Sequence, residues 1–588
     1  MARNKYDIDE LLESPFNLSH LKRCGKYIKR NLRDIMLSLL LSSLAIISTL
    51  CVPQLMKNVI DIGIPTADKW YIVRSTLLML LAILLFILFT RKRHVIMARV
   101  GQSIIADIRM DMFSHLQRLS FNYYDSRAHG KILVRIVQYV NRVSNMLSNG
   151  LIDFFLELIA IVFISIFMML TSFRLSLVVL AGLPVFLIVM AIISPIQRRA
   201  WQWYSNKNSN LASYAQENIN GVRVTQIFNR EPMNKEIFER LSLECKRTWL
   251  TAQYSSNVSW VSAEILSVAI SATIYGIAIL VASPPLTYGV ISAMTTYGFR
   301  FWQPIINLSR LYNELVNTIA YLERIFELMD EPVEIQDAPD ATPLPDIIGS
   351  VGFEHVVFEY ERDYPILDDL SFQIRPGERV ALVGPTGAGK TTIVNLISRF
   401  YDLRSGRVLI DGHDISKATL HSLRSQMGIM LQDSFVFSGT IADNVRYGKL
   451  DATIEEIQSA CKTVCADDFI RAMPDGYDTM IEEGGTNLSQ GQRQLISFAR
   501  TLIADPKILI LDEATSSIDT KTERLLQEGL QRLLENRTSF IIAHRLSTIK
   551  SCDRIMYVDK KNIVEQGSHD ELIAKKAAYY KLYTSQMQ

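Results

Sequence analysis

The sequence predicts two domains in series, an all-α membrane domain followed by an α/β nucleotide-binding domain with a phosphate loop. Two observations lead to this prediction. The first 325 or so residues contain several apolar segments of about 20 residues, the length needed to cross a bilayer. The remaining residues contain a glycine-rich loop and, further on, an apolar run that ends in two acids. A chain of 588 residues is also too long for a single hydrophobic core.

Composition excludes several classes of protein. The net charge of +2 gives no indication of a nucleic-acid partner. Six cysteines are too few for a disulfide framework. Cys461 and Cys465 fall on one helix face, but no His or Cys cluster accompanies them, so buried thiols are favoured over a metal site. The acidic N-terminus and the late start of the first apolar run, near Ile35, argue against a cleavable signal or a transit peptide.

Six segments are predicted to span the membrane, with long cytoplasmic extensions between them. The first four are clear from composition, the fifth contains Glu264, and the sixth contains Arg300 and Gln303. The predicted spans are 34–56, 71–93, 151–171, 175–195, 260–282 and 288–310.

The distribution of positive residues predicts the orientation. Lys and Arg are frequent before the first span and in the stretches 91–150 and 196–256. The opposite loops are poor in basic residues and hold only Lys57, Lys69 and Arg174. Positive residues remain in the cytoplasm, so the N-terminus and both long stretches are expected there. The sequence Ser283-Pro284-Pro285 predicts a tight external turn between spans five and six.

The long cytoplasmic stretches are expected to be helical. Apolar residues recur at helical spacing after the second span, at Ile104, Ile108, Met112, Leu116 and Leu119. About 28 residues of helix would reach roughly 40 Å from the membrane. The stretch is either a solvated hairpin or a lever between the membrane and a motor, and the phosphate loop downstream favours the lever.

A linker separates the two domains. Residues 330–350 contain four prolines in acidic surroundings, which prevents helix and sheet. The predicted domains are an N-terminal segment, a membrane domain, this linker and a nucleotide-binding domain, at 1–33, 34–328, 329–350 and 351–588.

The nucleotide-binding domain contains a strand–loop–helix phosphate site. Residues 379–383 form a short β run, and 391–400 are predicted as a helix. The glycines let backbone N–H groups approach phosphate oxygens. Lys390 can reach the β- and γ-phosphates, and the Thr391 hydroxyl can bind Mg²⁺. The residues predicted to bind nucleotide here are Gly384, Pro385, Thr386, Gly387, Ala388, Gly389, Lys390, Thr391 and Thr392.

Two further strands end in polar residues. Ile508 to Leu511 is typical of a buried parallel strand, and Asp512 and Glu513 follow it. Asp512 is suited to binding Mg²⁺ and Glu513 to polarising the attacking water; the alternative is a pair of helix-capping carboxylates. The run 539–543 precedes His544, which is expected to face the γ-phosphate, although a surface histidine is the simpler alternative.

With these motifs, the chain resembles an ATP-binding cassette (ABC) exporter half-transporter of the multidrug and lipid type. The resemblance covers nearly the whole chain, and seven motifs occur in the family's order. It implies that Tyr360 stacks on adenine, with Tyr364 a weaker candidate. It also implies a Q-loop at Gln432 that links Mg²⁺ and water to the membrane domain, an X-loop acid at Glu483, a D-loop at Asp519 and a switch histidine at His544. The signature would be Ser489, Gln490, Gly491 and Gln492.

The same resemblance implies details of the membrane half. Exporters of this type have six spans, an elbow helix, here near 15–33, and two cytoplasmic coupling helices. By alignment these fall near Ser120–Asp125 and Gln216–Val222. The second is expected to dock on the motor domain of a partner chain.

One position departs from the family pattern. The third signature residue is usually glycine, and here it is Gln490. Ser489 and the Gly491 backbone should still reach the γ-phosphate of ATP held by the partner. The substitution resembles the catalytically complete chain of heterodimeric multidrug exporters, so a heterodimer is slightly favoured. A homodimer stays open because Lys390, Glu513 and His544 are intact.

Arg300 in the sixth predicted span needs a physical explanation. A charged side chain near mid-membrane costs about 2.5–3.5 kcal/mol on insertion scales. One hypothesis places Arg300, with Phe301 and Trp302, on the transport path. The other is a structural ion pair with Glu264 or Glu157.

The predicted function is ATP-driven efflux of hydrophobic or amphipathic substrates, drugs or lipids, by alternating access at the cell membrane. The site would use ATP and Mg²⁺, in a dimer with a second half-transporter. A lipid or glycolipid flippase, a peptide exporter and an ATP-gated channel or sensor are the alternatives, and an importer on this scaffold stays open. The spans carry no pattern that identifies the substrate.

Overall fold

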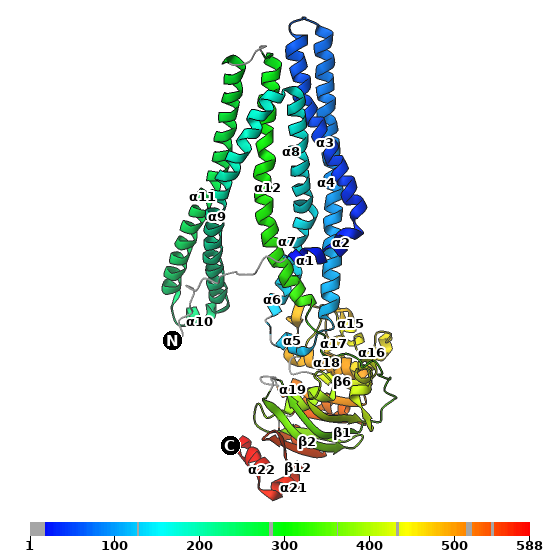
Figure 1. Ribbon diagram of the computed structural model, residues 1–588. Helices are drawn as coiled ribbons and strands as arrows, with labels where there is room; N and C mark the ends of the chain where they lie inside the picture. Colours follow the sequence, from blue (N-terminus) through cyan, green and yellow to red (C-terminus); the bar gives the residue numbers. More distant parts are fainter. Residues whose placement is uncertain are drawn as a thin grey trace. The chain divides into compact units, whose positions relative to one another are not determined.

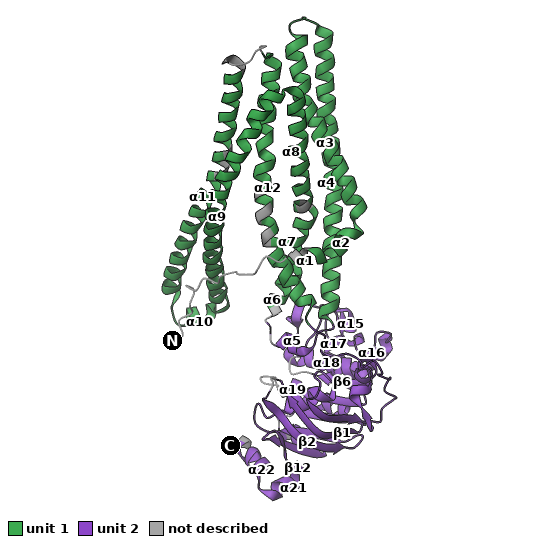
Figure 2. Ribbon diagram, in the orientation of Figure 1, with its two compact units in different colours: residues 1–117, 129–331 green, residues 118–128, 332–588 purple. Residues whose placement is uncertain are grey.

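The computed structural model describes residues 18–125, 127, 129–280, 286–360, 363–430, 434–512, 520–542 and 546–587. The chain divides into two compact units, shown in separate colours in Figure 2. Unit 1 contains residues 1–117 and 129–331, and unit 2 contains 118–128 and 332–588. The short segment 118–128 lies within the predicted membrane domain, yet it packs with the second unit.

The described residues of unit 1 form helices and the turns that connect them (Figure 1). Its α-helices are α1 (Leu18–Arg23), α2 (Gly25–Arg30), α3 (Leu32–Asn58), α4 (Lys69–Leu116), α6 (His129–Val134), α7 (Val140–Asn145), α8 (Leu151–Thr171), α9 (Phe173–Asn220), α10 (Val222–Ile227), α11 (Glu231–Leu280) and α12 (Tyr288–Met329). Three π-helical turns continue them, η1 (Val59–Gly63), η2 (Arg135–Tyr139) and η3 (Met146–Gly150).

Four helical stretches of the described chain are long and apolar enough to cross a membrane. They are Leu32–Gly63, Lys69–Leu116, Ile132–Thr171 and Phe173–Asn220, and they contain the four spans that are clear from composition. Helix α11 has a shorter apolar stretch, Glu264–Ile277, and α12 carries the polar residues already noted. The predicted external turn at 283–285 lies outside the described residues.

The stretches predicted to be cytoplasmic begin as unbroken continuations of the helices that contain the second and fourth predicted spans. Helices α4 and α9 are each 48 residues long, which corresponds to roughly 70 Å. The periodic apolar residues of α4 form one buried face, at Ile104, Ile108, Met112 and Leu116. The prediction of helical extensions is therefore confirmed.

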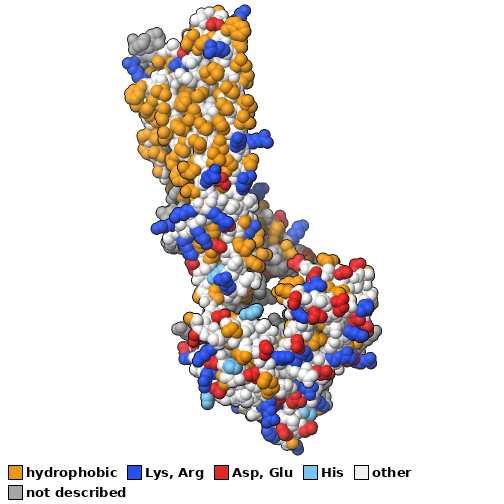
Figure 3. Space-filling model, turned by 90° about the vertical axis from the view of Figure 1, so that its right-hand side faces the viewer, with side chains coloured by type: hydrophobic (Ala, Val, Ile, Leu, Met, Phe, Trp, Pro, Cys, Tyr) orange, Lys and Arg blue, Asp and Glu red, His pale blue; other side chains and the backbone are white. Residues whose placement is uncertain are grey.

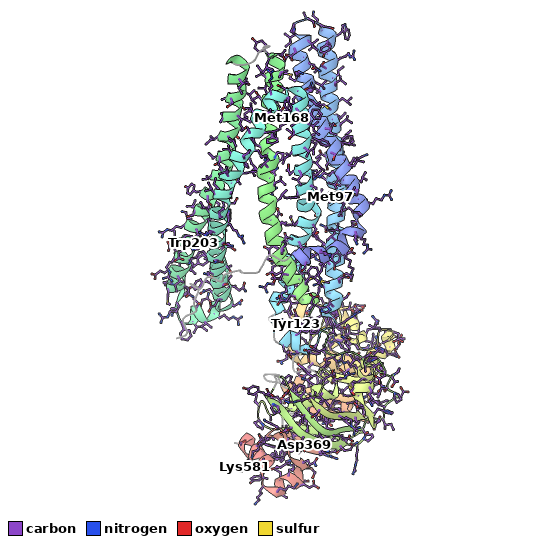
Figure 4. All side chains as sticks on the ribbon, in the orientation of Figure 1. Met97, Tyr123, Met168, Trp203, Asp369 and Lys581 are labelled. Carbon is purple, nitrogen blue, oxygen red and sulfur yellow. The ribbon has the colours of Figure 1, made fainter. Side chains whose placement is uncertain are left out.

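Unit 1 consists of a bundle and a helix pair. Helices α3, α4, α8 and α12 lie side by side, and α9 runs along α11, separating from α12 toward the α10 end (Figure 1). Their shared core includes Met168 of α8 (Figure 4), together with Phe186, Tyr297 and Trp302. Gly182 permits this close packing, since a Cβ there would lie 2.4 Å from the Ile270 side chain. In the space-filling view, apolar side chains cover the upper surface and basic ones gather below them (Figure 3).

The environment of Arg300 differs from both hypotheses in part. Phe301 and Trp302 are buried in the unit 1 core, so they do not line a path beside Arg300. Among the described residues, no acid forms an ion pair with Arg300. Its Nη1 donates to the carbonyl and the hydroxyl of Thr49, at 3.0 and 2.9 Å. Glu157 instead accepts a hydrogen bond from Asn307 Nδ2 at 2.7 Å.

Unit 2 is an α/β domain with two main sheets. The larger sheet has the order β12-β11-β3-β10-β9-β6, and the smaller, antiparallel sheet has the order β2-β1-β4-β5. Strands β6, β9, β10, β3 and β11 are parallel, and β12 is antiparallel to β11. The strands are β1 (Val351–Glu359), β2 (Pro365–Ile374), β3 (Arg379–Val383), β4 (Ser405–Ile410), β5 (His413–Asp414), β6 (Met427–Met430), β7 (Gly439–Thr440), β8 (Met480–Ile481), β9 (Ile508–Asp512), β10 (Thr538–Ile542), β11 (Arg554–Asp559) and β12 (Asn562–Gly567).

Helices cover both faces of the larger sheet. Along β3, Val380 and Leu382 face one hydrophobic core, and Ala381 and Val383 face the other. The helices are α5 (Phe121–Asp125), α13 (Lys390–Ile397), η4 (Ile415–Lys417), α14 (Leu420–Arg424), α15 (Ile441–Arg446), α16 (Ile454–Thr463), α17 (Asp467–Arg471), η5 (Gly476–Asp478), η6 (Glu483–Gly485), α18 (Gln490–Ile503), α19 (Thr520–Leu534), α20 (Leu546–Lys550), α21 (His569–Lys575) and α22 (Ala578–Met587).

The end of the proline-rich linker is fixed to unit 2 by one carboxylate. Asp411 accepts hydrogen bonds from the backbone N–H groups of Ile348, Gly349 and Ser350, at 2.6 to 3.2 Å. Burial alone would raise the pKa of Asp411, but these three donors outweigh it, so the pKa is lowered. The linker forms no helix or named strand, and it is held by these side-chain hydrogen bonds together with an isolated backbone bridge between Thr342 and Ala418.

Candidate nucleotide-binding site

The site lies at the carboxyl edge of the larger sheet. Strand β10 pairs with both β3 and β9, so that Ile542 lies opposite Leu382 on one side and Asp512 on the other. The glycine loop after β3 and the Asp512 carboxylate at the end of β9 therefore lie at the same edge, where open α/β sheets bind ligands. Four predicted site residues lie outside the described residues: Gln432, Glu513, Asp519 and His544.

The phosphate loop requires glycine at two positions. Gly384 has a φ of +145°, and a Cβ there would lie 2.2 Å from the Val558 carbonyl oxygen of β11. Gly389 has a φ of +101° and caps the start of α13. Both values fall where residues with a Cβ are strained. The loop backbone thus leads directly into a helix N-terminus, where free N–H groups favour phosphate oxygens.

The Lys390 side chain is hydrogen-bonded to the phosphate loop. Its Nζ donates to the carbonyl oxygens of Gly384 and Pro385, at 2.9 and 2.8 Å, and the side chain is buried. Burial lowers the pKa of the Lys390 amine, whereas the negative charge of Asp512 acts in the opposite direction. The amine is thus fixed within reach of both the loop and the β9 carboxylate.

Tyr360 is close to the phosphate-loop helix. Its hydroxyl lies 3.2 Å from Thr392 Oγ1, and the residue is 44% exposed. Two aromatic rings contact it nearly at right angles, Phe358 at 4.8 Å and Tyr401 at 5.1 Å between centroids. These contacts set the orientation of the ring. Tyr364, the weaker candidate, is 71% exposed.

Tyr401 also joins this aromatic group to the segment 118–128. Its hydroxyl donates to Asp125 Oδ2 of α5 at 2.8 Å. Beside it, Phe121 contacts Phe400 with ring centroids 4.5 Å apart. The α5 segment, which coincides with the expected first coupling helix, thus packs next to the neighbours of Tyr360.

The signature forms the start of α18. Ser489 Oγ accepts from the Gln492 N–H at 3.2 Å, and Gln492 Oε1 accepts from the Ser489 N–H at 2.9 Å. This capping box fixes the helix start. Arg493 Nη1 donates to the carbonyls of Gly485 and Leu488, both at 2.9 Å. The Gln490 side chain is exposed at the first helical position, so it does not disturb the cap.

Comparison with known families accounts for both units. Residues 35–303 match the family described as the ABC transporter transmembrane region, and residues 367–516 match the family described as ABC transporter. The chain is 39% identical over 596 aligned positions to an uncharacterized ABC transporter ATP-binding protein, YknV of Bacillus subtilis, covering 100% of this chain and 98% of that protein.

The chain belongs to the ABC transporter family.

Two further similarities indicate which kind of ABC transporter this chain is. The chain is 37% identical to a protein of Mycobacterium bovis named as a fatty acid ABC transporter ATP-binding/permease protein, covering 82% of this chain and 76% of the relative. A solved structure of a bacterial Atm1-family ABC exporter with ATP bound aligns with a TM-score of 0.79 and 29% identity, over 95% of this chain and 99% of that one. This chain is thus an ABC exporter whose ATPase domain binds ATP and couples its hydrolysis to transport.

The described residues of this ABC exporter fit a Mg²⁺ ion bound with the nucleotide. Mg²⁺ is usually held by one or two protein oxygens together with phosphate oxygens and water. Thr391 offers an exposed hydroxyl on α13, and Asp512 offers a carboxylate at the same sheet edge. These hard oxygen donors suit Mg²⁺.

Two residues and one contact that position this site were not identified from the sequence. They are Arg493, which holds the signature loop, Tyr401, which contacts Tyr360 and Asp125, and Thr392 in its contact with the Tyr360 hydroxyl. Thr392 was expected at the nucleotide, but not as a partner of Tyr360. No pattern in the sequence indicates these contacts, because Tyr401 and Asp125 are 276 positions apart.

Proposed function

We propose that this exporter moves hydrophobic or amphipathic compounds, drugs or lipids, out of the cytoplasm by alternating access. The observation that carries the proposal is the phosphate loop of unit 2, with its buried Lys390, in one chain with a helical membrane unit. The cell membrane is the proposed location. The N-terminus and the nucleotide-binding domain are placed in the cytoplasm, because Lys and Arg concentrate before the first span and in the long loops.

The proposed ATP site divides into residues that bind adenine, phosphate and Mg²⁺ and residues that act in hydrolysis. Tyr360 stacks on adenine, and the loop 384–392 binds the phosphates. Thr391 and Asp512, with Gln432, hold Mg²⁺, which supplies charge neutralisation on the phosphates. Glu513 polarises the attacking water, and the other catalytic residues are Gln432, Asp519 and His544.

The proposed partner is a second half-transporter whose ATP is closed over by the signature of this chain. In support, no hydrogen bond joins the signature residues 489–492 to the loop 384–392 among the residues described here. The capped end of α18 is therefore available to another chain. We favour a heterodimer because of Gln490, and the intact motifs keep a homodimer as the alternative.

Two exposed apolar surfaces support this arrangement. The turn from α9 through α10 exposes the apolar residues Ile219, Val222, Val224, Ile227 and Phe228. Unit 2 exposes Phe435, Phe437 and Tyr447, whose rings contact one another at about 5 Å. Arg500 supports the aromatic group by donating to the Phe435 carbonyl at 2.9 Å. In the proposed dimer, the α10 turn of one chain docks on the aromatic group of its partner.

The proposed exporter differs from a flippase and from a peptide exporter in the compound that it transports. The fatty acid relative favours an amphiphile. A lipid or glycolipid flippase is the first alternative and a peptide exporter the second. An ATP-gated channel is disfavoured because Glu513, needed for hydrolysis, is intact.

The test is the ATPase rate of this chain, expressed alone and reconstituted in lipid, with Glu513→Gln as the blank. Activity above the blank that rises with drugs or lipids supports the exporter and indicates a homodimer. A folded, ATP-binding but silent protein indicates that another half-transporter is required, and co-expression with a candidate partner then restores activity. ATP-dependent conductance in planar bilayers without transport would contradict the proposal.

A further inference from the structure

The Arg300 guanidinium is fixed in the middle of the membrane unit by neutral groups. Pro53 of α3 lacks the N–H that would bond to the Thr49 carbonyl, so this carbonyl is available to a side chain. Arg300 Nη1 of α12 donates to it at 3.0 Å and to Thr49 Oγ1 at 2.9 Å. One turn away, the Tyr297 hydroxyl donates to the Leu50 carbonyl at 2.8 Å.

These bonds orient the guanidinium without neutralising its charge. Both carboxylates of the neighbouring helix α8 have other partners, and no ion pair joins Arg300 to Glu264 of α11 among the described residues. Glu157 accepts from Asn307 at 2.7 Å, and Asp153 accepts from Arg93 at 2.6 Å. A guanidinium has five N–H donors, and the bonds found here for Arg300 use one nitrogen. Donors on Nε and Nη2 are therefore available to a ligand.

Arg300 lies at the depth and on the helix face that a transported molecule would contact. Helix α12 begins at Tyr288, and twelve residues of helix place Arg300 about 18 Å further on, near the midplane of a hydrocarbon core of about 30 Å. On the same face, Thr296 lies one turn before Arg300 and Gln303 and Asn307 lie one and two turns after it, and all three are at least partly exposed. Phe299, next to Arg300, is 45% exposed and offers apolar surface.

We propose that Arg300 binds the anionic headgroup, a carboxylate or a phosphate, of the amphiphile that this exporter transports. Guanidinium pairs with both groups through two parallel N–H···O bonds, and such pairs are strengthened in a low dielectric. The bond to Thr49 holds the side chain ready, so little rotamer entropy is lost when the anion binds. The proposal names the substrate class for the export proposed above and rests on that function.

A resident phospholipid of the bilayer also carries an anionic headgroup that a guanidinium can bind. Such a headgroup stays at the membrane surface, whereas Arg300 is near the midplane, so a molecule in transit is favoured. The two sources predict different responses. A transported anion stimulates ATP turnover at a saturating concentration in zwitterionic membranes, whereas a resident lipid acts only through the composition of the bilayer.

The test uses the full-length protein in nanodiscs of zwitterionic lipid, with its partner chain if it needs one. ATPase stimulation is measured with three probes of equal chain length: myristate, myristyl alcohol and myristyltrimethylammonium. Photolabelling with a diazirine analogue of myristic acid reports binding independently of hydrolysis. The variants are Arg300→Gln and Arg300→Lys. The matched control is Arg310→Gln, because Arg310 is on the same helix but 68% exposed and beside Glu314.

Myristate is expected to stimulate at the lowest concentration. Arg300→Gln is expected to raise its half-stimulating concentration by about 10- to 100-fold, with a parallel loss of photolabelling, and to leave the response to the alcohol unchanged. Arg300→Lys retains most of the preference, because it keeps the charge, and Arg310→Gln behaves as wild type.

Four outcomes would overturn the proposal. Equal stimulation by acid and alcohol would remove the headgroup preference. A lower thermal midpoint in Arg300→Gln with unchanged myristate response would show that the bond to Thr49 is structural only. Recovery of the myristate response in the charge-swapped Arg300→Glu, Glu264→Arg variant would show an ion pair between helices. A response to anionic lipid in the bilayer alone would identify a resident lipid.

Failure of the exporter proposal gives a different result. In that case no probe raises the ATPase rate above the Glu513→Gln blank, while photolabelling still reports whether Arg300 binds the anion.

Discussion

Replacing Tyr360 with alanine is expected to weaken ATP binding by about 5- to 150-fold. Stacking of a base on an aromatic side chain contributes about 1–3 kcal/mol, and each 1.4 kcal/mol changes an affinity tenfold. The upper part of this range is expected. The edges of Phe358 and Tyr401 already orient the ring, so adenine meets an ordered surface.

Two control variants distinguish the contribution of the Tyr360 ring to ATP binding from that of its hydroxyl and from that of the nearby Tyr364. Tyr360→Phe removes the contact with Thr392 Oγ1 but keeps the ring, so its affinity should stay within about threefold of wild type. Tyr364→Ala removes a ring that is 71% exposed, and its affinity should not change. The assay is displacement of a fluorescent ATP analogue from the full-length protein in a Glu513→Gln background, which prevents hydrolysis during the titration.

The reasoning fails if Tyr364→Ala weakens binding and Tyr360→Ala does not, because adenine would then stack on the other ring. It also fails if Tyr360→Phe lowers the affinity for ATP as much as Tyr360→Ala does. In that case the hydroxyl contact with Thr392, and not the aromatic face, would carry the effect.

Four further predictions concern the motor. Glu513→Gln should nearly abolish ATP turnover yet allow ATP-dependent closure, and near-normal turnover would contradict its role. Lys390→Ala should weaken ATP binding in equilibrium titration. Asp411→Asn should destabilise unit 2 by about 1–3 kcal/mol in denaturant unfolding. Because the folded-state pKa of Asp411 is lowered, this contribution is present above its unfolded pKa of about 4 and is lost as the pH falls through the folded value. Tyr401→Phe, without the hydroxyl that bonds α5, should reduce substrate stimulation of the ATPase more than basal activity.

The sequence predicts the strands of the phosphate site to within about one residue, because these strands are buried on both faces. The predicted strand 379–383 coincides with β3, and the apolar run 508–511 lies within β9, because a strand covered on both faces reads as a continuous apolar run. The predicted helix 391–400 ends earlier, since α13 stops at Ile397 and Arg399 has a φ of +48°. Helix ends depend on local capping, which periodicity does not report.

Contacts between distant residues could not be predicted in this way. Arg300 is a mid-membrane charge that the sequence identifies, but its partner is a carbonyl made available by Pro53, 247 positions earlier. An ion pair with Glu157 was a reasonable expectation from charge alone. The expectation was wrong because a single chain gives no information on which helix faces meet, and Asn307 already occupies the Glu157 carboxylate.

The position of Tyr401 suggests how nucleotide binding is communicated to the membrane helices. Tyr401 contacts Tyr360 through its ring and Asp125 through its hydroxyl. The segment that contains Asp125 continues directly from α4, which is a single helix from the membrane to Leu116. Adenine stacked on Tyr360, as proposed above, is expected to limit the rotation of that ring, and the edge contact would then limit Tyr401. The hydrogen bond to α5 is therefore expected to strengthen when nucleotide binds, and its loss is expected to affect coupling before hydrolysis.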